Sequence, residues 1–135
     1  MAFILSLDEG TTSARAALYD ERGRSVAMES CPIHSRYPQP GWVEQAAVEI
    51  WNAQKTAACR VLESAGAAAS DIRAVGITNQ RETTIVWERS TGRPVAPAIV
   101  WQCRRTADYC AELAASPAAA VIERKSVDIA WAKVT

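Results

Sequence analysis

The chain has 135 residues, and its fifteen Lys and Arg residues balance its fifteen Asp and Glu residues. This length suffices for one domain with one hydrophobic core. The balanced charge and the lack of a basic run exclude the electrostatic footprint of a nucleic-acid binder, so we expect a small-molecule partner. The apolar run at the N-terminus is too short for a signal peptide or a membrane span. We therefore expect a cytoplasmic protein without a membrane partner.

The four cysteines lack the CxxC spacing and the nearby histidine of a zinc site. In a reducing compartment we expect them to be buried free thiols. The single histidine, His34, has no acid or nucleophile beside it in the sequence. We place it in a loop or at the end of a strand.

The first part of the chain predicts an antiparallel meander. Strands are expected at residues 3–7, 14–19 and about 25–33, because each run is apolar and ends at a turn-forming segment. The segment YPQPGW at residues 37–42 carries two prolines and a glycine, which favour a long irregular connection.

A helix and a returning strand follow. Apolar residues from about 46 to 65 have helical spacing, and Gly66 is suited to end the helix. The run IRAVGIT at residues 72–78 predicts a strand. Because strand, helix and strand make a crossover, we predict an α/β fold with a mixed sheet covered by helices.

The last third of the chain is less regular. We expect a strand at residues 83–88, closed by a turn at 90–94, and a helix over about 104–115. The pair Ser116 and Pro117 is typical of the start of another helix, with the sequence AAAVIERK. The final ten residues show no clear element, and without a closing strand we expect the chain to be a fragment.

The segment LDEGTTSAR at residues 7–15 sets two acids against a turn of one glycine and three hydroxyl side chains. Backbone N–H groups and hydroxyls in a tight turn bind phosphate well. Asp8 could hold Mg²⁺ through its waters, and Arg15 could add positive charge. The segment lacks the lysine of a Walker A loop. An ordinary hairpin turn with an acidic tip remains the alternative.

Two further segments predict a polyol site. Arg81 and Glu82 lie between apolar runs, where a guanidinium can donate to hydroxyls and a carboxylate can accept from them. The alternative is a surface ion pair of little energetic value. Trp101 could form an apolar wall against the carbon side of a polyol, or it could be a core residue. We expect Arg104 and Arg105 to be structural or solvated.

Four stretches of the sequence carry a family resemblance: LDEGTTSAR, YPQPGWVEQ, GITNQRETTIVWERSTGRP and IVWQCRRT. Over about the first 110 residues they resemble the N-terminal portion of the glycerol kinases within the FGGY family of carbohydrate kinases. That family has two actin-like ATPase domains of the ribonuclease H-like fold, with the ligands in the cleft between them. The resemblance implies that residues 1–135 form an incomplete first domain.

The resemblance also assigns roles to residues. It implies ATP-dependent, Mg²⁺-assisted phosphorylation of glycerol to sn-glycerol 3-phosphate, the first step of glycerol utilisation. By position, Asp8 matches the acid near the metal. The residues matched to contacts with the ATP or ADP nucleotide are Thr11, Thr12, Ser13 and Arg15. Those matched to contacts with glycerol are Arg81, Glu82 and Trp101.

Three departures from the family pattern bear on activity. Glu9 stands where the family usually has glutamine, which places an extra negative charge near the phosphates. Cys103 replaces an aspartate, which removes a hydrogen-bond acceptor beside the substrate region. Residues 128–135 replace a pattern that supplies a glycerol-contacting tyrosine. The family's general-base aspartate lies beyond this chain, so we expect the isolated chain to be inactive or nearly so.

Two other functions remain open on this sequence. The first is phosphorylation of another sugar, a pentulose or gluconate, by an FGGY kinase. The second is a non-catalytic, actin-like remnant that binds a nucleotide. In either case a missing second domain would leave an apolar face exposed, so self-association into a homo-oligomer is also expected.

Overall fold

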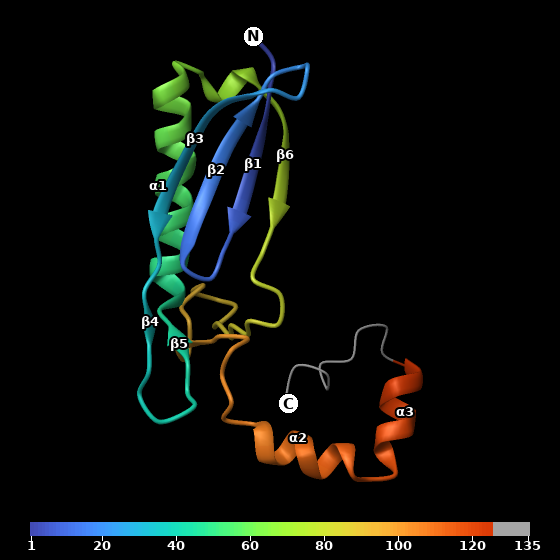
Figure 1. Cartoon of the computed structure of the whole chain (residues 1–135). Helices are drawn as coiled ribbons and strands as arrows, with labels where there is room; N and C mark the ends of the chain where they lie inside the picture. The colour runs from blue at the N-terminus through green and yellow to red at the C-terminus, as the bar shows by residue number, and fades with distance from the viewer. Residues whose placement is uncertain (126–135) are drawn as a thin grey trace.

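A computed structural model describes residues 1–125 of the chain. Its main feature is a four-stranded mixed sheet with the order β3-β2-β1-β6. The strands are β1 (Phe3–Glu9), β2 (Ser13–Tyr19), β3 (Ser25–Pro32) and β6 (Ile72–Thr78). Neighbours β1, β2 and β3 are antiparallel, whereas β6 runs parallel to β1 (Figure 1). The predicted meander, crossover and α/β class are confirmed.

Helix α1 (Ala47–Ala65) covers one face of this sheet (Figure 1). It connects β3 to β6, which lie at opposite edges of the sheet, and a short 3₁₀ helix (Ala69–Asp71) precedes β6. Alternate residues of β1 and β2 point toward the helix. One apolar core results, and its buried members include Phe3, Leu5, Ala14, Ala16, Leu18, Ile50, Ala53, Ala57 and Val61.

The end of α1 follows from Gly66. This residue has a φ of 60°, in the left-handed region that residues with a Cβ rarely adopt, and its N–H donates to the Glu63 carbonyl at 3.1 Å. Glycine at this position is a common helix terminator. The predicted helix and its terminator are confirmed.

A second, three-stranded sheet lies beyond the ends of the main strands. Its strands are short and antiparallel: β4 (Ser35–Arg36), β5 (Glu44–Gln45) and β7 (Ala98–Ile99). The strand expected at residues 83–88 is wrong, since only isolated bridges join Thr84 to Ile99 and Trp87 to Pro94. Pro97, which lies between the two bridges, has no N–H to donate to the opposing segment, and this interrupts the ladder there.

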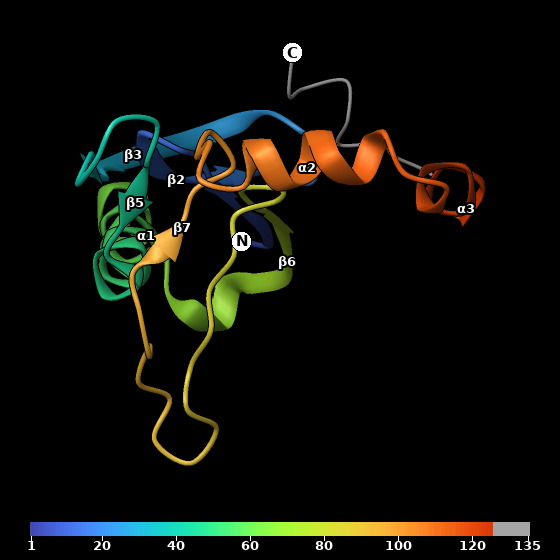
Figure 2. The same ribbon diagram turned by 90° about the horizontal axis from the view of Figure 1, so that it is seen from below.

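Helices α2 (Ala107–Ala114) and α3 (Ala118–Lys125) extend to one side of the sheets (Figure 2). Helix α2 starts three residues later than predicted, and the Arg104 N–H before it donates to the Gly41 carbonyl at 2.7 Å. The predicted second helix is confirmed, and the Ser116 hydroxyl accepts from its first N–H at 3.2 Å. The tyrosine departure at residues 128–135 lies outside the described residues.

The described part of the chain contains four free cysteines, but only Cys31 is buried. The expectation of buried thiols is therefore wrong for Cys59, Cys103 and Cys110. His34 lies between β3 and β4 as predicted, and its Nδ1 is 2.6 Å from Glu49 Oε1. No helix among residues 1–125 is long and apolar enough to cross a membrane.

Candidate functional site

A cavity of about 250 Å³ lies where β1 and β6 end and the chain beyond β7 passes. Two groups of predicted site residues meet there, the acidic turn and the polyol segment. Its lining residues are Asp8, Glu9, Gly10, Thr11, Asn79, Gln80, Arg81, Glu82 and Trp101. Parallel strands β1 and β6 deliver the first two segments to the same edge of the sheet, and this explains the meeting of residues about seventy positions apart.

The turn after β1 is a tight hairpin turn. The Gly10 N–H donates to the carbonyl oxygens of Asp8 at 3.2 Å and Ser13 at 3.1 Å. A Cβ at Gly10 would lie 2.7 Å from the Ser13 carbonyl oxygen, closer than real Cβ atoms come. The turn therefore requires glycine, and its backbone remains compact beside the cavity.

Trp101 links this turn to the chain beyond β7. Its indole Nε1 donates to Thr11 Oγ1 at 2.9 Å. With 46% of its surface exposed, Trp101 is not a core residue, and the core alternative is wrong. The indole stands at the cavity with one edge hydrogen-bonded and its ring available as an apolar surface.

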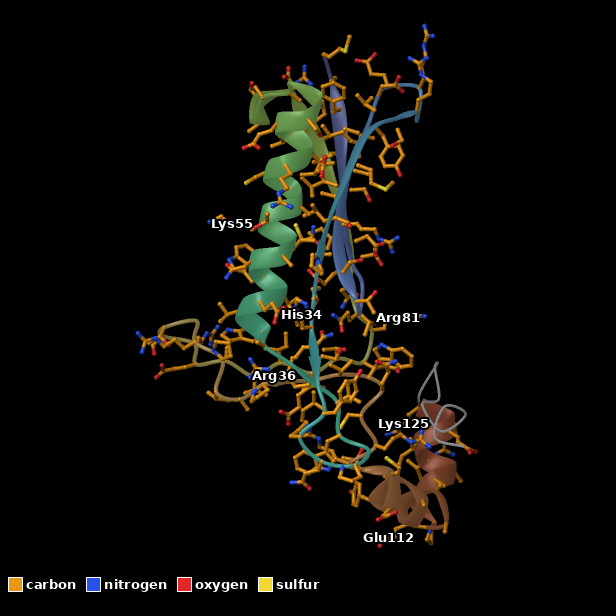
Figure 3. All side chains as sticks on the ribbon, turned by 60° about the vertical axis from the view of Figure 1, so that its left-hand side comes forward. His34, Arg36, Lys55, Arg81, Glu112 and Lys125 are labelled. Carbon is orange, nitrogen blue, oxygen red and sulfur yellow. The ribbon has the colours of Figure 1, made fainter. Side chains whose placement is uncertain are left out.

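Arg81 and Glu82 occupy a turn that follows β6. The turn is closed by the Thr83 N–H, which donates to the Gln80 carbonyl at 3.4 Å. Glu82 has a φ of 66°, the only positive value at a non-glycine residue among residues 1–125. Such backbone strain costs about 1–3 kcal/mol and is found mainly at functional sites. Both side chains are exposed, and Figure 3 shows Arg81 at the lower end of the strands, pointing outward.

Asp8 and Arg15 form an ion pair across the β1–β2 ladder. Arg15 Nη2 lies 2.7 Å from Asp8 Oδ2, and the two residues are register partners. Asp8 lines both this cavity and a second depression over the sheet, whereas Arg15 lines only the second. Thr12 and Ser13 do not line the cavity either. Of the predicted nucleotide-contacting residues, the structure therefore brings only Thr11 next to the polyol segment.

Glu9 is the most perturbed acid of this site. Burial, and to a smaller extent the neighbouring Asp8 charge, raises the pKa of Glu9 from 4.5 to about 7. Its Oε1 atom is buried and has no hydrogen-bond partner within residues 1–125. The expected extra negative charge near the phosphates is therefore reduced, because burial favours the protonated, neutral form of this carboxyl.

Two buried glutamines hold the cavity wall, and the sequence analysis missed both. Gln45 in β5 is 0% exposed, and Gln80 after β6 is 8% exposed. Gln80 Nε2 donates to the Gly10 carbonyl at 3.0 Å, and Gln45 Nε2 donates to the Thr11 carbonyl at 2.7 Å. Both glutamines lie within motifs that carry the resemblance, but only burial distinguishes them from surface glutamines.

Arg105 is structural, as predicted. It lies over the Trp42 ring, 3.9 Å from the centroid, and its Nη2 is 2.8 Å from Glu44 Oε1. Its Nε donates to Cys103 Sγ at 2.9 Å. Burial raises the pKa of the Cys103 thiol. Hydrogen bonds, chiefly from Arg105, lower this pKa by more than burial raises it, so the net pKa is below its usual value. Cys103 thus still supplies an acceptor, contrary to expectation.

Protein side chains could supply only some of the ligands of a divalent cation at this cavity. The described residues contain no group of three or more His, Cys, Asp or Glu side chains arranged to hold a metal. Asp8 is a carboxylate at the cavity, and such oxygen ligands suit Mg²⁺, which keeps several waters and takes one or two carboxylates beside phosphate oxygens. The site therefore fits Mg²⁺ that arrives with a nucleotide.

The chain has a mixed sheet, a crossover helix and a cavity at the strand ends. This arrangement is consistent with the N-terminal domain of an actin-like ATPase. The model of the FGGY family of carbohydrate kinases, N-terminal domain, matches residues 3–135. The chain belongs to this family.

Individual relatives agree with the family. The chain is 56% identical over 113 residues to glycerol kinase 2 of Thermotoga maritima, covering 84% of this chain and 23% of the relative. It is 51% identical over 126 residues to the glycerol kinase of Polaromonas naphthalenivorans, covering 93% of this chain and 25% of that relative. The chain thus spans about a quarter of the length of these relatives.

Solved structures show the same fold. The glycerol kinase of Plasmodium falciparum, solved with ADP, superposes with a TM-score of 0.76 at 32% identity, covering 93% of this chain and 25% of that one. A xylulose kinase from Rhodospirillum rubrum gives a TM-score of 0.76 at 27% identity, covering 89% of this chain and 25% of the xylulose kinase chain. Fold similarity therefore does not distinguish between the substrates named for these kinases.

Proposed function

We propose that the chain is the N-terminal part of a glycerol kinase. In the whole enzyme, the γ-phosphoryl group of ATP would pass to a terminal hydroxyl of glycerol, giving sn-glycerol 3-phosphate and ADP. The observation that carries the proposal is the single cavity that joins the turn at Asp8 and Thr11 to Arg81, Glu82 and Trp101. The identity to glycerol kinases, above 50% for the relatives described, favours glycerol over other polyols.

The turn would bind the nucleotide side of the reaction. Hydroxyls of Thr11, Thr12 and Ser13 would donate to phosphate oxygens, and Arg15 would add positive charge from the adjacent strand. Bound Mg²⁺ supplies neutralisation of the phosphate charge, and Asp8 would hold it through water. Because Arg15 is paired with Asp8, its contribution would be to orient that carboxylate as much as to meet phosphate.

The segment after β6 would bind glycerol. Arg81 would donate hydrogen bonds to the hydroxyls, Glu82 would accept from them, and Trp101 would cover the carbon chain. Glu82 lines the same cavity as Arg81 and Trp101 and has a strained, left-handed backbone, which supports a role at the site. This chain's residues would thus align the hydroxyl with the phosphoryl group, which is the main protein contribution to such transfers.

The test is a chimeric kinase in which this chain's segment replaces the matching segment of the Thermotoga maritima relative. We expect it to phosphorylate glycerol faster than xylulose or gluconate. Arg81→Ala should then raise the KM for glycerol by about 10- to 150-fold, since a hydrogen bond to a charged group is worth about 1.5–3 kcal/mol. Initial rates over a range of glycerol concentrations measure this change.

Arg89→Ala is the matched control, because Arg89 is exposed and does not line the cavity. Its KM for glycerol should equal that of the parent chimera. Faster turnover of xylulose than glycerol would replace the substrate assignment by the pentulose alternative. A chimera that binds Mg-ADP but phosphorylates none of these substrates would favour the non-catalytic remnant.

A further inference from the structure

The buried glutamines belong to a closed ring of hydrogen bonds around the cavity wall. Gln45 Nε2 donates to the Thr11 carbonyl at 2.7 Å, and Gln80 Nε2 donates to Gln45 Oε1 at 3.1 Å. Thr83 Oγ1 donates to Gln80 Oε1 at 3.0 Å and accepts from the Trp101 N–H at 3.3 Å. The Trp101 indole N–H donates to Thr11 Oγ1 at 2.9 Å, and this hydrogen bond closes the ring.

The ring fixes both amide orientations. Gln80 uses its two amide hydrogens on the Gly10 carbonyl and on Gln45. Gln45 uses its two on the Thr11 carbonyl and on Ser35 Oγ, at 2.7 and 3.0 Å. A carboxylate at either position has no hydrogens to give, and it would face carbonyl oxygens instead. Only an amide can serve as donor and acceptor here at once.

The ring joins segments that regular backbone pairing leaves apart. Thr11 belongs to the turn after β1, Gln45 to β5, Gln80 and Thr83 to the segment after β6, and Trp101 to the chain beyond β7. Three of these segments supply the residues proposed to contact the ligands: the turn after β1 for the nucleotide, and the segment after β6 and Trp101 for glycerol. The ring's members lie within or directly beside the cavity lining, and its two glutamines are excluded from solvent.

We propose that Gln45 and Gln80 are positioning residues that couple the phosphate-binding turn to the polyol-binding segment. Through the ring, a ligand that orders one segment also orders the other, so that glycerol tightens nucleotide binding and the nucleotide tightens glycerol binding by the same factor. This inference rests on the proposed function, because it names the device by which the two halves of that site act together.

The test uses the chimeric kinase and titrates Mg-ADP calorimetrically with and without saturating glycerol. In the parent we expect glycerol to lower the Kd of Mg-ADP by about fivefold or more. In Gln80→Glu and in Thr83→Val this factor should fall below about twofold. Thr83→Val breaks the ring without burying a charge, so it still tests the proposal if Gln80→Glu does not fold.

The matched control is Gln54→Glu. Gln54 is a buried glutamine of α1 whose Nε2 donates to the Arg15 carbonyl at 3.0 Å, outside the ring. The same amide-to-carboxylate change should lower the melting temperature there and leave the coupling factor as in the parent. Equal loss of coupling in Gln54→Glu would assign the effect to general destabilisation and overturn the proposal, as would parental coupling in both ring variants.

Amide hydrogen exchange of the 135-residue chain separates this inference from the proposed function. The Gly10 and Trp101 amides should exchange about tenfold faster or more in Gln80→Glu than in the unmodified chain, with no ligand present. A parent chimera that binds neither ligand would refute the proposed function, while faster exchange would still show that the ring ties the segments together. Unchanged exchange rates at both amides would overturn the proposal that the ring ties these segments together.

Discussion

Two regions of the molecule are held together by different means. Residues 3–78 form a sheet and a covering helix, in which backbone ladders pair the strands and apolar side chains fill the core. Residues 79–106 contain only the two-residue strand β7 and isolated bridges. This second region combines scattered backbone hydrogen bonds, such as those between Thr84 and Ile99, with side-chain contacts, chiefly the glutamine ring and Arg105. The candidate site lies at the boundary, so it depends on both kinds of stabilisation.

This difference has a consequence for stability. Loss of apolar volume in the sheet should lower the free energy of unfolding of the whole chain, because the core is one contiguous cluster. Loss of a polar contact in residues 79–106 should loosen that region while the sheet persists. Three substitutions test the contrast, in order of decreasing effect.

The largest effect is expected for Leu18→Ala in β2. Leu18 is fully buried between the sheet and α1, so the substitution leaves a cavity and should cost about 3 kcal/mol of the free energy of unfolding. Urea denaturation followed by circular dichroism measures it. Val26→Ala in β3 is the control, because Val26 is half exposed and should cost less than about 1 kcal/mol. Equal losses in the two variants would mean that this sheet face is not a packed core.

A smaller and local effect is expected for Arg105→Ala. The substitution removes the donors to Glu44 and Cys103 and the cation over Trp42, which should cost about 2 kcal/mol. Hydrogen exchange should quicken at residues 98–105 but not in β2. Arg105→Lys keeps the charge but cannot donate to both acceptors in the same fork, so it should recover only part of the loss. Faster exchange throughout the sheet would contradict a local role.

The smallest effect is expected for Glu9→Gln, and it depends on pH. Because the folded state raises the pKa of Glu9 from 4.5 to about 7, folding holds this proton more tightly than the unfolded chain does. The associated stability is present below about pH 4.5 and is lost as pH rises through about 7. Discounted for partial exposure, Glu9→Gln should be more stable than the parent by about 1–2 kcal/mol at pH 8.

Thermal unfolding of the parent and Glu9→Gln from about pH 3.5 to about pH 8.5 measures this difference. The two chains should converge at the acid end, where the carboxyl is protonated in both the folded and the unfolded state. A parent chain that gains stability relative to the variant as the pH rises would reverse the sign and contradict a raised pKa. Glu63→Gln is the control, since Glu63 is an exposed residue of α1 outside the site.

The sequence predicted the regular elements well where periodicity is strong. The run IRAVGIT was expected as a strand at the residues that form β6, and AAAVIERK as the helix that forms α3. The strand expected at residues 83–88 failed because a strand needs a partner. The facing segment contains Pro97, which has no N–H to donate, and no property of TTIVWE itself reveals this.

The candidate site was likewise predicted only in part from the sequence. Asp8, Thr11, Arg81, Glu82 and Trp101 were selected from the sequence, and all five line one cavity. The roles assigned to these residues and to Thr12, Ser13 and Arg15 stay predictions. The glutamine ring and the raised pKa of Glu9 were not foreseeable, because burial and partner geometry set both, and neither is encoded in local spacing.

The sequence by itself determined the family, the α/β class and the chemical groups available at the site, because residue types and short-range periodicity carry that information. Only the tertiary structure decided which groups meet. Parallel pairing of β1 with β6 brings the acidic turn to the arginine segment, and Trp101 is held beside them by its hydrogen bonds to Thr11 and Thr83. Distant segments come together through burial and hydrogen-bond pairing, and those depend on the whole chain at once.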